Sequence, residues 1–342
     1  MLRHQPHKFA PLVMCLLVAL AACAPAASNL ATSVPPTLAP TATRVPPTAT
    51  SAATATAAAS ATPASITLTD SLGREVTLAS PAVKIVSLAP SNTEILFAIG
   101  AGDRLIGRDD FSDFPAEAAS VPSVGSLYPS VNAEAIVALQ PDLVLAAGIT
   151  NPDDIKHLAD LGLAVYATSI AKTLDDIYSD ITAVGALTGE ADAAAALVDS
   201  MKTRVEAVST KTSAVASKPV VFYELDATEP SKPWTAGPGT FIDQMISLAG
   251  GANAGNIATS DYAQLSLEQL VAQNPDIIIL GSATFGGQTP ELVAARPGWG
   301  DIKAVKDNAV YTFDDNLVSR PGPRVVDGLE QMAKLIHPEL FK

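Results

Sequence analysis

One stretch of the sequence, Tyr128–Gly148, occurs a second time further along the chain. Each copy predicts a short helix, a Pro-Asp break and then a continuous apolar strand, of the kind that helices cover on both faces of a parallel sheet. Any two helix–strand units of an α/β protein share this general pattern. The ungapped agreement between the copies nevertheless favours a true duplication, and hence two related lobes. The offset that places Tyr128 on Tyr262 also aligns Glu134 with Glu268, Val137 with Val271, Ala138 with Ala272, Pro141-Asp142 with Pro275-Asp276, and Leu143-Val144-Leu145 with Ile277-Ile278-Ile279.

The start of the chain has the parts of an export signal. Basic residues precede an apolar run, Phe9–Leu20, which is too short for an ordinary spanning helix of about 20 residues. Leu20-Ala21-Ala22-Cys23 resembles a bacterial lipobox, in which the signal is cut before the cysteine and that cysteine receives lipid. We therefore expect residues 1–22 to be a lipoprotein signal peptide and Cys23 to be the lipidated residue; a plain signal peptide is the alternative. Cys15 would be removed with the signal, so the mature chain could form no disulfide within itself.

Residues 23–65 consist almost entirely of Ala, Thr, Pro and Ser. Such a segment has too few large apolar side chains to offset the entropy of ordering, so it is predicted to be a disordered tether.

The charge of the chain is strongly negative, with a formal net charge of −14 at pH 7. Nucleic acids and anionic membrane faces attract Lys and Arg, so this balance argues against either as a partner.

The remaining chain is predicted to form an N-terminal lobe (66–170), an interlobe helical segment (171–215) and a C-terminal lobe (216–342). The first lobe opens with an alternating hairpin, Ile66–Leu78, followed by a buried strand and a helix that Ser91 or Asn92 could cap. The interlobe segment contains two helix-periodic stretches, Thr173–Leu187 and Glu190–Val208. The second is long enough to act as a rigid strut between the lobes. In the last lobe, Asp226–Gly239 is interpreted as a loop that carries Trp234.

Four motifs in order resemble the solute-binding proteins of ATP-driven importers for vitamin B12, siderophores and haem. The resemblance covers nearly all of Ile66–Lys342 and is greatest for the vitamin B12 binders. It implies a class III architecture, in which two Rossmann-like lobes with parallel sheets are joined by one long rigid helix and hold the ligand between them. The motifs are SLAPSNTEILFAIGAGDRLIG, FSDFP, NAEAIVALQPDLVLA and SRPGPR.

The resemblance also implies partners and a location. The protein would be a monomer outside the cytoplasm, anchored to the cell membrane by its lipid, and would deliver a small molecule to an ABC permease with ATPase subunits. In such proteins one glutamate on each lobe docks to permease arginines, and the corresponding residues here are Glu134 and Glu268. Alternatively, both are ordinary first-turn glutamates, which are favourable near any helix N-terminus.

The ligand residues implied by the resemblance lie in four aromatic positions and one polar loop. Phe111, Tyr128, Trp234 and Tyr262 fall where vitamin B12 binders line the cleft, and flat aromatic faces suit a large, partly apolar macrocycle. Asp315 and Arg320 correspond to residues placed against the corrin amides, although Asp314 is an alternative to Asp315. The sequence departs from that pattern after the first repeated strand, where the vitamin B12 binder has an aromatic residue and this chain has Ala147 or Gly148. It also has tyrosines in place of two tryptophans.

We expect a bound cobalamin or another metal chelate, with no separate cofactor and no protein metal site. Haem is an alternative that needs an axial His or Tyr; the histidines lie in the signal or at predicted helix ends, which leaves Tyr128 or Tyr262. An anionic ferric siderophore is another alternative and favours arginines, for which Arg104, Arg108 and Arg320 are the supply.

An exported enzyme and an adhesion protein are the alternatives from other functional classes. No dinucleotide or nucleophile-elbow motif is present and no histidine is placed to act as a base, so no catalytic residue is predicted. The lipid anchor and tether suit an adhesion protein as well as a receptor, and they do not separate the two.

Overall fold

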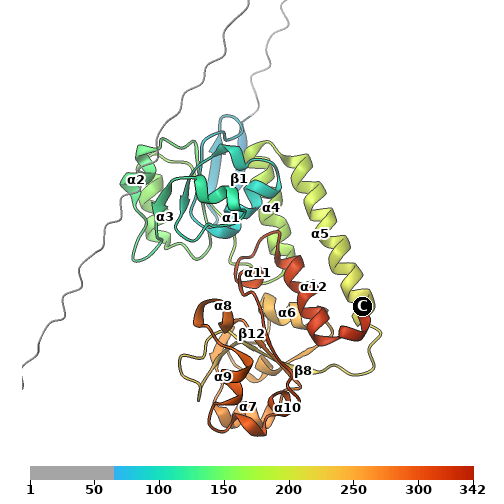
Figure 1. The fold of residues 1–342 in the computed structure, drawn as a ribbon. Coiled ribbons are helices and arrows are strands. Elements are labelled where there is room, and N and C mark those ends of the chain that lie inside the picture. Colours follow the sequence, from blue (N-terminus) through green and yellow to red (C-terminus); the bar gives the residue numbers. More distant parts are fainter. Residues whose placement is uncertain (1–64) are drawn as a thin grey trace, which may run out of the picture. The chain divides into compact units, whose positions relative to one another are not determined.

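The computed structural model describes residues 65–342. The predicted signal peptide (1–22), Cys23 and all but the last residue of the predicted tether lie outside the described residues. Within 65–342, none of the helices has both the length and the apolar character needed to span a bilayer. The described chain contains two parallel sheets with helices packed around them (Figure 1).

The N-terminal lobe is built on a five-stranded parallel sheet in the order β5-β4-β3-β6-β7. The predicted hairpin is confirmed, because β1 and β2 pair antiparallel as a separate two-stranded sheet. The elements are β1 (Ile66–Thr69), β2 (Glu75–Leu78), β3 (Ile85–Ser87), α1 (Pro90–Ala98), β4 (Leu105–Asp109), β5 (Ser123–Gly125), α2 (Ala133–Ala138), β6 (Leu143–Ala146), α3 (Pro152–Asp160) and β7 (Val165–Ala167), with 3₁₀ turns at Gly102–Arg104 and Ala116–Ser120.

The C-terminal lobe repeats this arrangement with a four-stranded parallel sheet in the order β10-β8-β12-β13. A separate antiparallel pair, β9 with β11, lies in the same lobe. The elements are β8 (Val220–Glu224), β9 (Trp234–Ala236), α6 (Phe241–Leu248), β10 (Ala252–Asn253), β11 (Tyr262–Gln264), α7 (Leu267–Gln273), β12 (Ile277–Leu280), α8 (Ser282–Gly286), α9 (Pro290–Ala294), α10 (Lys303–Lys306), β13 (Val310–Thr312), α11 (Asn316–Ser319) and α12 (Val325–Ile336), with 3₁₀ turns at Ala254–Ile257, Trp299–Asp301 and Pro338–Leu340.

The duplicated stretch has the same local structure in both lobes. The turn after each helix contains a residue with positive φ, Gln140 at 50° and Asn274 at 44°, at equivalent positions of the repeat. The aspartate of each Pro-Asp then accepts backbone N–H groups at the start of the neighbouring strand: Asp142 ahead of β3, and Asp276 from Val220 at 2.8 Å. The repeat thus includes the turns and their side-chain hydrogen bonds as well as the helix and strand.

The interlobe segment forms two helices, α4 (Leu174–Thr188) and α5 (Ala191–Thr212). The first begins with a capping box between Thr173 and Asp176 and ends at Gly189, whose φ of 76° is readily adopted by glycine. The second is the predicted long helix and extends four residues beyond the predicted end at Val208. One apolar core runs from the first lobe through these helices to the second, and includes Leu143, Ile181, Met201, Ile279 and Leu329.

Two local interpretations were wrong. Neither Ser91 nor Asn92 caps α1, because the helix already begins at Pro90; Asn92 is buried and donates from its side chain to the Ala146 carbonyl at 3.0 Å. Trp234 is the first residue of β9 rather than part of a loop, because pairing with β11 makes that segment extended.

Candidate ligand-binding cleft

A cavity of about 430 Å³ lies where the carboxyl ends of the parallel strands approach each other. From the N-terminal lobe, the residues that directly follow β6 and β7 line it, together with Asp109 at the end of β4. From the C-terminal lobe, Leu225 after β8, Phe285 on α8 and the segment Asn316–Pro321 line it. In open α/β sheets the carboxyl ends of strands are the usual place for ligands, and the volume is in the range of small-molecule sites.

The cavity wall is mostly apolar, and six of its large apolar side chains are exposed rather than packed. The strongest cases are Phe285, which is 73% exposed, and Tyr128, which is 69% exposed. A soluble chain seldom leaves so many large apolar groups open to water in one place unless they bind something. Those that line the cavity and are exposed are Phe111, Tyr128, Ile149, Ile170, Tyr262 and Phe285.

Two carboxylates in the wall organise the loops around them. Asp109 is buried and accepts from the backbone N–H of Phe111 at 3.0 Å and from the Ser112 hydroxyl. Asp180 on α4 accepts from both the backbone N–H and the hydroxyl of Ser169, the latter at 2.7 Å. Burial raises the pKa of each carboxyl above the ordinary value for aspartate.

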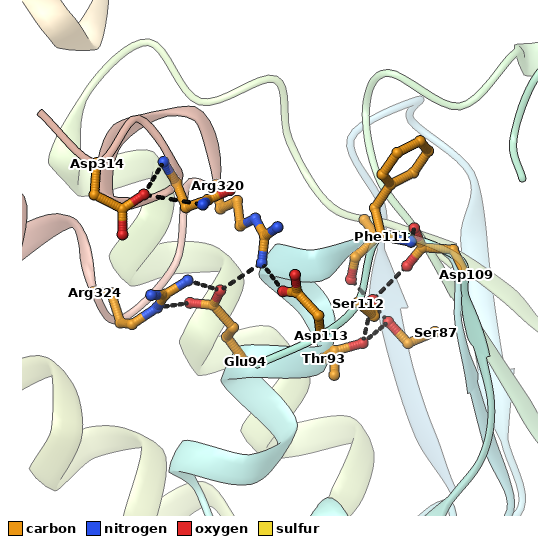
Figure 2. Close-up of polar contacts among 12 residues, drawn as sticks. Ser87, Thr93, Glu94, Asp109, Phe111, Ser112, Asp113, Asp314, Arg320 and Arg324 are labelled. Carbon is orange, nitrogen blue, oxygen red and sulfur yellow. Dashed lines mark hydrogen bonds and ion pairs between the residues drawn. The ribbon is translucent and has the colours of Figure 1, made fainter. Parts of the chain in front are cut away.

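Behind Asp109 a short chain of buried hydroxyls leads to Ser87 on β3 (Figure 2). The Thr93 hydroxyl lies 2.9 Å from those of both Ser87 and Ser112, and Ser112 in turn donates to Asp109. All four side chains are buried. These hydrogen bonds tie the backbone of the Phe111 loop to α1 and β3.

An ion-pair network joins the two lobes beside the cavity (Figure 2). Glu94 on α1 accepts two hydrogen bonds from the Arg324 guanidinium, at 2.6 and 2.9 Å. Arg320 lies 3.7 Å from the same carboxylate and 2.5 Å from Asp113, and this second pair lowers the pKa of Asp113. Arg324 also lies 3.9 Å above the Phe114 ring. The acids and the ring belong to the first lobe and the arginines to the second.

Four of the six predicted ligand residues lie in the cavity wall: Phe111, Tyr128, Tyr262 and Arg320. Trp234 and Asp315 are not among the lining residues. Trp234 lies in β9 opposite Gln264, and Asp315 is buried, where its carboxylate accepts a 2.7 Å hydrogen bond from the Tyr223 hydroxyl. Asp314 is exposed and accepts from the Asn316 backbone N–H.

Sequence reasoning missed three of the wall's apolar side chains: Ile149, Ile170 and Phe285. Each lies in the connection just after a parallel strand or on the short helix that follows one. The signal that could have found them is this position, since large apolar residues directly after buried strands reach the carboxyl edge of the sheet. Ala147 and Gly148, the departures from the aromatic pattern, also line the cavity.

The two predicted docking glutamates occupy equivalent exposed positions. Glu134 is the second residue of α2, which Asn132 caps, and Glu268 is the second residue of α7, which begins with a Ser266–Gln269 capping box. Among the described residues neither glutamate takes part in an ion pair. Within residues 65–342, no three His, Cys, Asp or Glu side chains are grouped so that they could hold a metal ion.

A family model described as periplasmic binding protein matches residues 85–317, which is more than half of the chain. This chain belongs to the periplasmic binding protein family. Its family and relatives are extracytoplasmic solute-binding proteins, not enzymes, and the fold is the expected class III architecture.

Curated relatives of this periplasmic binding protein cover most of its length. An uncharacterized ABC transporter substrate-binding lipoprotein of Bacillus subtilis, YvrC, is 34% identical over 280 residues, which are 81% of this chain and 87% of the relative. A cobalamin-binding protein of Halobacterium salinarum is 32% identical over 278 residues, or 80% and 74% of the two chains.

Solved structures agree with the fold. The vitamin B12 binding protein BtuF of Vibrio cholerae has a TM-score of 0.64 and 28% identity, covering 77% of this chain and 99% of that one. The haem-binding protein RhuT of Roseiflexus has a TM-score of 0.68 and 25% identity, covering 75% and 98%. The protein is therefore the substrate-binding component of an ABC importer, which implies a permease with its ATPase and a small-molecule ligand.

Proposed function

We propose that this binding protein captures a cobalamin-type corrinoid in the cavity between its lobes and delivers it to an ABC permease. The observation that carries the choice of ligand is the cavity wall, which is apolar on both lobes and has little free positive charge. A corrin presents broad apolar faces edged by neutral amides, and exposed aromatic and aliphatic side chains can cover such faces with a small loss of rotamer entropy.

The charges of the wall argue against an anionic chelate. Arg320 is the single basic residue among the lining residues, and its guanidinium is paired with Asp113 and close to Glu94. The other charged lining residues are the carboxylates Asp109 and Asp180. The carboxylates of haem or of an anionic siderophore would have to compete for this one arginine, whereas the neutral amides of a corrinoid need no counter-charge.

One observation favours haem as the ligand: Tyr128 and Tyr262 both line the cavity, and a phenol can serve as an axial ligand of haem iron. Partial burial and the nearby Asp261 and Asp315 carboxylates raise the pKa of Tyr262, which disfavours the phenolate form that binds ferric iron best. The relatives whose names state cobalamin or vitamin B12 binding add support for the corrinoid.

Delivery uses the two exposed glutamates and the predicted lipid. Glu134 and Glu268 place one exposed anion on each lobe at equivalent positions of the duplication, which suits a permease of approximate two-fold symmetry. Lipidation of Cys23 would hold the protein at the outer face of the membrane, with residues 24–65 as a tether between the anchor and the lobes.

The test is a titration of the full-length lipoprotein in detergent with cyanocobalamin, haemin and a ferric hydroxamate, followed by calorimetry and absorbance. We expect saturable binding of cyanocobalamin, weakened roughly tenfold or more in Tyr128→Ala because one buried aromatic contact is lost. Leu292→Ala is the matched control, since Leu292 is 52% exposed and does not line the cavity. Preferential binding of haemin or the hydroxamate would show that the ligand is haem or a siderophore instead of a corrinoid, and would leave the importer role intact.

A further inference from the structure

The helices that carry the two glutamates have an unusual pattern of identity. Their paired positions are identical at Glu134/Glu268, Val137/Val271 and Ala138/Ala272, and all six of these residues are exposed. The buried position between them differs, with Ile136 in one helix and Leu270 in the other.

In duplicated segments that serve only the fold, the buried positions should be identical more often than the exposed positions. Buried positions are constrained by packing, whereas exposed positions tolerate most substitutions at little cost. Here the two copies agree at three exposed positions and differ at the buried one, although Ala135 and Gln269 also differ. A shared requirement outside the fold, acting on both lobes, accounts for this agreement.

The valines strengthen the point. Val137 is 39% exposed and Val271 is 37% exposed, although a β-branched residue is a poor choice for an exposed position in a helix of six or seven residues. Each valine lies three residues after its glutamate and each alanine four residues after, so all three side chains lie on one helix face. We call this surface the Glu-Val-Ala face.

We infer that Val137 and Val271 are the apolar half of a duplicated docking contact, one on each lobe, for a permease surface that presents a basic group beside an apolar patch. The inference rests on the proposed function, because it assigns the glutamates to the same contact. A charge in a mixed polar and apolar interface sets register and encounter rate, while the buried apolar neighbour contributes affinity that salt does not screen.

The experiment measures binding of the full-length lipoprotein to the purified permease–ATPase complex of its importer in nanodiscs, at low and at high salt. The main variant is Val137→Thr/Val271→Thr, which keeps the shape and β-branching but adds a hydroxyl to each contact. Val83→Thr is the control, because Val83 is 60% exposed and lies outside both helices. Glu134→Gln/Glu268→Gln is measured in parallel, and every variant is titrated with cyanocobalamin.

We expect the valine double variant to bind the permease roughly tenfold more weakly and to keep the salt dependence of the wild type. The glutamate double variant should bind more weakly and lose much of that salt dependence. The control should match the wild type, and cyanocobalamin affinity should be unchanged throughout.

Wild-type docking by the valine variant, with weakened docking by the glutamate variant, would overturn this inference and leave the proposed docking by glutamates standing. Wild-type docking by both would overturn the two together. If the proposed ligand is wrong, the wild type itself will not bind cyanocobalamin, and that result is distinct from both docking outcomes.

Discussion

Replacement of Arg324 by methionine should destabilise the protein, because it leaves a buried carboxylate without its main partner. Glu94 is 3% exposed and accepts both of its short hydrogen bonds from Arg324. Methionine has a similar apolar length but supplies neither charge nor donor, and it also removes the guanidinium that lies over the Phe114 ring. The change therefore removes the ion pair together with this cation–π contact.

The expected cost is about 3 kcal/mol. Removal of one partner of a buried ion pair typically costs about 3–5 kcal/mol, because the other charge remains desolvated. The lower end applies here since Arg320 remains 3.7 Å from the Glu94 carboxylate. At about 2–4 °C per kcal/mol for a chain of this size, the melting temperature should fall by about 6–12 °C.

The loss should depend on pH in a definite direction. Burial raises the folded-state pKa of Glu94 above its ordinary value of 4.5, and loss of Arg324 raises it further. Between the unfolded and folded pKa values the folded variant binds more protons than the unfolded chain, so its free energy of unfolding falls as pH rises. The difference from wild type is then largest at pH 8 and shrinks toward pH 4.5.

Equilibrium urea unfolding at pH 8 and pH 4.5 measures this difference. Glu94→Gln in the Arg324→Met background should recover much of the loss at pH 8, because it removes the stranded charge. Arg204→Met is the comparison at a site more open to solvent, where pairs with Asp327 and Glu330 should contribute at most about 1 kcal/mol. An Arg324→Met loss of equal size at both pH values, with no recovery in the double variant, would refute the reasoning.

Two further predictions concern stability. Gly281→Ala should destabilise the protein by about 1–3 kcal/mol in urea unfolding, because the new Cβ would lie 2.5 Å from the Tyr223 hydroxyl oxygen. Gly286→Ala is the control, since no atom lies nearer than 3.9 Å to its new Cβ. Equal losses in the two variants would contradict this account. Asp142→Ala should cost about 1–3 kcal/mol by the same measurement, more than Asp276→Ala. The reason is that Asp142 accepts from the Val83 and Lys84 N–H groups ahead of β3, whereas Asp276 accepts one backbone N–H, that of Val220; the reverse order would refute it.

The elements that sequence predicts best are those with a local signature repeated in both lobes. The strand runs Leu143–Ala146 and Ile277–Leu280 begin directly after Pro-Asp, and their helices lie where the apolar periodicity placed them. These features succeed because a buried strand, a turn with positive φ and a short capped helix are each determined within a few residues.

The cavity could be predicted only in part, because its wall is assembled by tertiary packing. Phe285 and Ile170 come from different lobes and share no local pattern that marks a ligand site. The Glu94–Arg324 pair joins residues 230 positions apart, and charges so distant carry no spacing signal. The prediction that Trp234 and Asp315 bind ligand rests on correspondence between loops. That correspondence carries no information about the strand pairing of Trp234 or the buried hydrogen bond between Asp315 and Tyr223.

The duplicated unit connects the two surfaces on which the proposed function depends. In the first lobe, α2 presents the Glu-Val-Ala face, and β6 after it leads directly to Ala147 and Gly148 in the cavity wall. In the second lobe, α7 presents the same face and β12 leads to α8 and Phe285. Because β6 and β12 are buried along their whole length, we expect each helix–strand unit to move as one body. A ligand that contacts both lobes should then also set the separation of the two Glu-Val-Ala faces offered to the permease.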